Sequence, residues 1–169
     1  MEPISYLYRE LILELVNSTN EDKGLDEDEQ AFAIELKAKS LNLTNPLDFD
    51  EKQCKDIYSS IVDSLLSDYL SQIKSELREG KVETELIPEA GGNFESEAVA
   101  IPITGTPDLY VGWTYFFGGG KHSNPESVEW MENCYLVKAK DEVRTVRIFE
   151  REFPLDPDAI WEGCRNPES

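Results

Sequence analysis

The chain's only histidine lies in a glycine-rich segment, Gly118–Ser127 (GGGKHSNPES), next to a lysine. Glycines such as Gly119 would let a ligand approach the backbone, while Lys121 and His122 would supply charge. The segment lacks the Walker phosphate-binding pattern, because Tyr115 stands where a glycine belongs and His122 where serine or threonine belongs. We therefore interpret it as a candidate binding loop, with a plain hairpin connection as the alternative.

Aromatic residues concentrate in Leu109–Phe117 (LYVGWTYFF), which has the composition of a β-strand. Strand alternation places Trp113 and Tyr115 on one face, which we expect to form core. Tyr110 and Phe116 lie on the other face and must also meet something: a partner protein, a small ligand or the chain's own tail.

Two pocket hypotheses follow from these aromatics. Gly112 would leave a dent on the face of Tyr110 and Phe116, which predicts a pocket or an interface there. The other hypothesis places a small-molecule pocket between the longest helix and the sheet. Its lining would be Trp113, Tyr115 and Trp130, with Lys121 and His122 at the mouth.

Metal-binding and catalytic patterns are absent from the sequence. Cys54, Cys134 and Cys164 are widely spaced and, with a single histidine, give no paired zinc-ligand spacing. The acidic run at 20–29 does not match the calcium-loop pattern, and no G-x-S-x-G elbow occurs. We therefore predict no metal, no cofactor and no catalytic residue, while the 35 Asp and Glu residues leave a catalytic carboxylate pair open.

Helical periodicity dominates the first half of the chain. Apolar residues predict a first helix from Ile4 to Val16, ended by the polar run 17–20. Asp26 begins a second helix in a capping-box pattern. A third stretches from Asp50 to Glu79 and would be about 45 Å long at the helical rise per residue. At that length it either kinks or forms the spine on which the rest packs.

Strand patterns dominate after Gly80. Besides Leu109–Phe117, we expect strands within 82–87, 98–103, 128–139 and 143–150, and Pro102 confines its strand to a sheet edge or a bulge. The predicted fold is α+β, with about three N-terminal helices, the third long, packed on an antiparallel meander of about four to five strands. We expect one domain, in which 1–80 is helical, 81–152 forms the sheet and 153–169 is an extended tail.

The chain is strongly acidic, with 35 Asp and Glu against 16 Lys and Arg and a net charge of −19 at pH 7. Such a charge is repelled by phosphate backbones and anionic membrane surfaces, so we expect no direct binding to double-stranded nucleic acid or membranes. It favours a basic protein partner. Sparse, odd-numbered cysteines and an N-terminus without a basic signal region predict a reducing, cytoplasmic location.

Together these features favour a non-enzymatic acidic binding or regulatory protein that engages a basic protein partner. Inhibitors of basic nucleases, immunity-type proteins and nucleic-acid mimics all fit this description. The alternative is the small-molecule-binding α+β domain with the aromatic pocket described above. A homo-oligomer completed through a sheet edge or the third helix is a further option.

Overall fold

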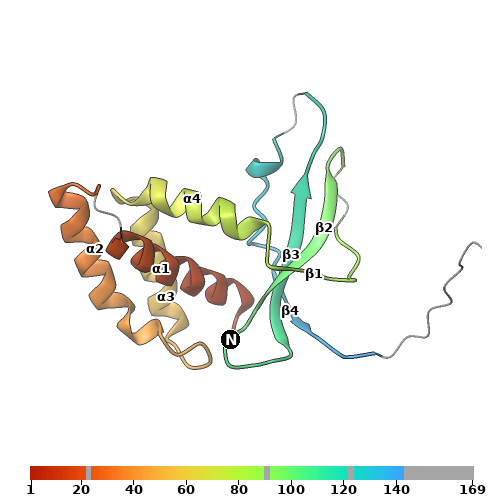
Figure 1. The fold of residues 1–169 in the computed structure, drawn as a ribbon, viewed down its shortest axis with the longest axis horizontal. Helices are drawn as coiled ribbons and strands as arrows, with labels where there is room; N and C mark the ends of the chain where they lie inside the picture. The colour runs from red at the N-terminus through yellow and green to blue at the C-terminus, as the bar shows by residue number, and fades with distance from the viewer. Residues whose placement is uncertain (22–23, 90–91, 122–123, 143–169) are drawn as a thin grey trace, which may run out of the picture.

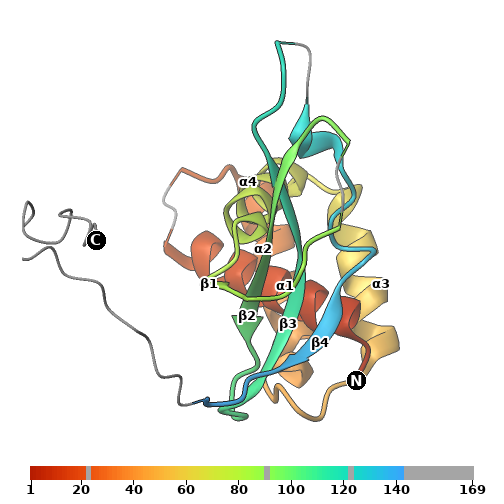
Figure 2. The same cartoon turned by 90° about the vertical axis from the view of Figure 1, so that its right-hand side faces the viewer.

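The computed structural model describes residues 1–21, 24–89, 92–121 and 124–142. Within these ranges the chain is α+β: four helices are followed by a four-stranded antiparallel sheet, and the helices gather on one face of it (Figures 1 and 2). The predicted fold class is confirmed. The expected strand at 143–150 and the tail at 153–169 lie outside the described residues.

Helix α1 (Pro3–Glu21) lies at the centre of the helical layer, in contact with helices α2, α3 and α4 and strands β3 and β4. Its core side chains, Tyr6, Leu7, Leu11, Ile12 and Leu15, are 0% exposed. The helix continues through the polar run at which we expected it to end. Thr19 is buried and its hydroxyl donates to the Leu15 carbonyl at 2.9 Å, so this polar side chain is satisfied inside the helix.

Helix α2 (Glu27–Ser40) begins with the predicted capping box. The Asp26 carboxylate accepts from the Glu29 backbone N–H at 2.9 Å, and the Glu29 carboxylate accepts from the Asp26 N–H at 2.9 Å. A short 3₁₀ turn, η1 (Leu41–Leu43), ends it. The buried Arg9 side chain holds this end against α1, because its Nε donates to the Leu43 carbonyl at 2.6 Å.

The predicted third helix is divided into α3 (Glu51–Val62) and α4 (Ser67–Arg78). Ser64 lies at the break, where its hydroxyl donates to the Ile61 carbonyl at 2.7 Å and accepts from the Leu66 N–H at 3.1 Å. A serine hydroxyl competes with the helical backbone for hydrogen bonds in this way. The break buries Leu66 completely and lets both α3 and α4 pack against α1. Of the two expected outcomes for this long helical stretch, a kink or a single spine, the chain therefore follows the first, as a break between α3 and α4.

The sheet has the order β1-β2-β3-β4, and each strand is antiparallel to its neighbour. The strands are β1 (Val82–Glu83), β2 (Glu95–Pro102), β3 (Leu109–Phe117) and β4 (Tyr135–Lys138). Strand β1 pairs only with Val99 and Ala100, so Pro102 occupies a part of β2 that β1 does not cover. The strand expected from residue 128 begins only at Tyr135, after the 3₁₀ turn η2 (Pro125–Ser127) and a further turn.

Trp113 joins the two layers. Its side chain is 0% exposed, and its indole Nε1 donates to the Arg78 carbonyl at the end of α4, at 2.9 Å. Its ring lies against the buried Trp130, with centroids 4.7 Å apart. The tryptophan therefore supplies apolar burial, a ring contact and a hydrogen bond across the helix–sheet boundary.

We predict that Trp113→Ala lowers the free energy of unfolding by about 3–5 kcal/mol, as expected for removing a large buried aromatic. Urea unfolding measures this. Ile34→Ala is the control, because Ile34 is 71% exposed and the substitution should change stability by less than about 0.5 kcal/mol. Equal stabilities of the two variants would contradict the assigned role of Trp113.

Candidate functional site

The aromatic residues predicted to line a pocket are distributed between core and sheet faces. Trp113 and Trp130 are 0% and 4% exposed and pack on each other. The Tyr115 ring, half-buried, lies 5.1 Å from the Arg78 guanidinium carbon. Phe116, 8% exposed, faces the opposite way and contacts Phe94. The expected core face of β3 is thus present, and Trp113 has no exposed surface to offer a ligand.

The dent expected at Gly112 is filled by strand β4. A Cβ atom at Gly112 would lie 2.8 Å from Val137 Cγ2 and 3.0 Å from Tyr135 Cε2, so those side chains occupy the space above the glycine. Tyr110 pairs with Val137 in the strand register and is half-buried. The missing Cβ therefore serves the packing of β4 on β3.

The glycine-rich segment lies beyond the end of β3. Gly119 and Lys121 are exposed, and Gly118 and Gly119 have φ angles of 64° and 97°, a backbone region that favours glycine. His122 lies outside the described residues. The described members of the predicted site thus occupy the core, the two sheet faces and this loop.

The two described cysteines are held as neutral thiols. Cys54 is 0% exposed, its Sγ donates to the Ser5 carbonyl at 3.4 Å, and burial raises its pKa to about 12. Burial likewise raises the pKa of Cys134 to about 11. A thiol is a poor nucleophile until it ionises. Among the described residues, no group of three or more His, Cys, Asp and Glu side chains is placed to hold a metal.

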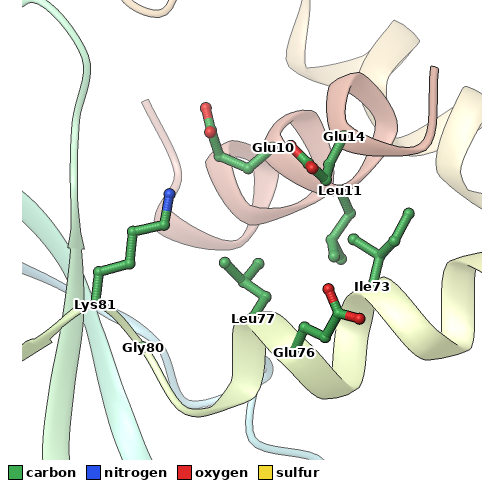
Figure 3. Close-up of a pocket in the computed structure, with 8 residues that line it drawn as sticks. All are labelled: Glu10, Leu11, Glu14, Ile73, Glu76, Leu77, Gly80 and Lys81. Atoms are coloured by element: carbon green, nitrogen blue, oxygen red, sulfur yellow. The ribbon is translucent and has the colours of Figure 1, made fainter. Parts of the chain in front are cut away.

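A cavity of about 220 Å³ lies between α1 and α4 (Figure 3). Leu11 of α1 points toward Ile73 and Leu77 of α4. Leu77 is half-buried and Ile73 is 8% exposed, so these two side chains form an apolar floor above the completely buried Leu11. Carboxylates stand around it, from Glu10 and Glu14 on α1 and from Glu76 on α4. Gly80 and Lys81 line one end, where the lysine side chain extends toward α1. We call this cavity the α1–α4 groove.

Helical periodicity creates the groove on the α1 side. Glu10, Glu14 and Asn17 recur at intervals of four and three residues and therefore share one face of the helix. Glu14 and Asn17 are exposed and Glu10 is half-buried, while Leu11 and Leu15 beside them are 0% exposed. The carboxylates thus occupy the solvent-facing stripe of a helix that is otherwise largely enclosed.

Gly80 closes the groove at the end of α4. Its φ is 70°, and a Cβ there would lie 2.7 Å from the Val99 Cβ. Both facts require glycine, because a side chain would be strained by the backbone and would collide with strand β2. The turn directs the chain from α4 into β1 and places Lys81 beside the groove.

Three carboxylates and one ammonium group line the groove, so it carries a formal charge of −3 + 1 = −2. Glu14 and Glu76 are exposed, and the Glu76 carboxylate accepts from the Gln72 amide at 3.2 Å. Glu10 differs, because its carboxylate accepts from the Arg9 guanidinium and is partly neutralised by it. Glu14 and Glu76 are therefore the carboxylates best placed to meet an incoming cation.

Sequence reasoning missed this site. The available signal was the pair Glu10 and Glu14, four residues apart in an otherwise apolar helix. The other wall was hidden, because α4 reaches α1 only after the chain breaks at Ser64.

Comparisons of the chain with protein-family models, curated proteins and solved structures found no match. In the described ranges no helix is long and apolar enough to cross a membrane.

The raised Cys54 pKa predicts a loss of stability at alkaline pH. Because the folded-state pKa of about 12 lies above that of an unfolded thiol, stability falls as pH rises past the unfolded value. Each pH unit above about 8.5 removes about 1.4 kcal/mol. We predict that the stability advantage of the wild type over Cys54→Ala shrinks by about 2 kcal/mol between about pH 8 and about pH 10. Urea unfolding of both proteins measures it, and parallel pH curves would contradict the prediction.

Proposed function

We propose that the chain is a non-enzymatic binding or regulatory protein that engages a basic protein partner through the α1–α4 groove. The observation that carries this proposal is an apolar floor surrounded by carboxylates on the surface of a chain with a net charge of −19. Exposed carboxylates attract and orient a cationic partner, while an apolar floor offers burial once contact is made. An inhibitor-like or immunity-like role fits this arrangement.

The size of the groove favours part of a protein over a whole small molecule. Its volume of about 220 Å³ is below the roughly 300–1,000 Å³ of small-molecule sites. It is enough for one or two side chains projecting from a larger partner. The small-molecule alternative gains no support from the placement of its key residue, since Trp113 is fully buried.

A reducing, cytoplasmic setting remains part of the proposal. Cys54 and Cys134 are free thiols, and neither forms a disulfide with another described residue. Such a pattern is typical of proteins from reducing compartments. The charge of the groove fits a basic protein partner as well, because Lys81 is the single basic residue among those lining it.

We predict that immobilised protein captures a basic protein from its native lysate at low salt and releases it at about 1 M salt, where the Debye length is about 3 Å. Capture should fall in the double variant Glu14→Gln with Glu76→Gln. The matched control is Asp56→Asn with Glu132→Gln, which removes the same charge from exposed positions elsewhere. Quantitative mass spectrometry compares the captured proteins. Capture that resists salt, or that falls equally in both variants, would contradict the proposal.

A further inference from the structure

The surface beside the α1–α4 groove is also hollowed, on the α1 side alone. A second hollow of about 370 Å³ is lined by Glu14, Asn17, Ser18 and Asn20, and it shares Glu14 with the groove. The α1 residues that line the two hollows run from Glu10 to Asn20. Ten residues of helical rise correspond to about 15 Å. The surface available to a partner is therefore elongated along the helix axis.

The walls of the groove exclude backbone pairing as the mode of recognition. Both walls are α-helices, whose interior N–H and C=O groups are already hydrogen-bonded within each helix. An extended peptide lying between them would find no row of free backbone groups and would leave its own unpaired. A helix satisfies its backbone internally, so it suits a groove between two helices beside which α1 is hollowed further, as far as Asn20.

The side chains specify the chemistry of that occupant. Leu77 and the exposed edge of Ile73 offer an aliphatic floor, beneath which Leu11 is completely buried. Glu14 stands on the α1 wall and Glu76 on the α4 wall, so a carboxylate borders the floor on each side. An occupant that matches this cross-section has an aliphatic stripe with a cation on each flank.

We propose that the α1–α4 groove binds a basic amphipathic helix of the partner, about three turns long and lying along α1. Its aliphatic residues, spaced at i and i+3 or i+4, contact Leu77 and the exposed edge of Ile73, above the buried Leu11. Lysine or arginine on its two flanks pairs with Glu14 and Glu76. This inference rests on the proposed function and specifies its recognition element.

A second copy of the chain is a poorer occupant on electrostatic grounds. Each copy carries a net charge of −19, so association of two copies opposes like charges. A cationic helix is instead attracted by the negative charge of the chain. Charge complementarity therefore selects a foreign basic helix over self-association.

The test uses a synthetic leucine–lysine peptide in which leucine recurs at helical spacing. A scrambled peptide of the same composition and polylysine serve as the comparison ligands. Calorimetry at low salt should show saturable binding of the amphipathic peptide by the full chain. Affinity should fall about fivefold in Glu14→Gln with Glu76→Gln, since two exposed ion pairs are lost, and stay unchanged in Asp56→Asn with Glu132→Gln.

The floor is tested separately by Leu77→Gln, which should weaken the amphipathic peptide and leave polylysine binding unchanged. The Glu14 and Glu76 variants keep the test valid if Leu77→Gln fails to fold, because both carboxylates are exposed.

Equal affinity for the amphipathic and scrambled peptides would overturn the helix inference while leaving the proposed function standing. Failure of the proposed function instead appears as salt-resistant or variant-insensitive capture from lysate. Sedimentation of the unliganded chain as a dimer that the Glu14 and Glu76 changes dissociate would also overturn the inference, in favour of a second copy.

Discussion

The enclosure of helix α1 determines the rest of this architecture. Helices α2, α3 and α4 and strands β3 and β4 all contact it, and Leu7, Leu11 and Leu15 are completely buried. Burial of such side chains provides the main driving force for folding, and it requires that the other elements surround this one helix. What α1 leaves to solvent is mainly the stripe of Glu10, Glu14 and Asn17. The groove is therefore a consequence of how the core is built, because α4 packs beside that stripe.

Two buried arginines connect helix ends to their surroundings. Arg9, 4% exposed, donates to the Leu43 and Thr44 carbonyls. Arg78, 8% exposed, donates to the Phe116 and Pro125 carbonyls and lies over the Tyr115 ring. A buried charge is costly unless polar groups satisfy it, and here backbone carbonyls accept hydrogen bonds from the guanidinium groups. No described ion pair includes Arg78, so carbonyl oxygens and an aromatic face stabilise its charge. Arg78 thus fixes the end of α4 against β3, and with it one wall of the groove.

The sequence predicted those features that depend on local pattern. The capping box of Asp26 and Glu29 and the strand Leu109–Phe117 are both present, and each is marked by the types of neighbouring residues. The break at Ser64 was not located, since a hydroxyl in a strongly apolar helical pattern ends the helix only when tertiary packing rewards the turn. The groove was missed for the same reason, because its two walls meet only in the folded chain. Aromatics such as Trp113 attracted the functional interpretation but supply core.

The proposed partner is a basic helix that lies on the floor between α1 and α4. Methyl NMR spectra recorded during titration with the leucine–lysine peptide test it most directly, because they report which side chains the peptide contacts. We predict the largest shift changes at Leu77 and Ile73, with a smaller change at Leu11 beneath them. Changes confined to exposed apolar residues elsewhere, such as Ile34, Leu41 and Ile87, would contradict it.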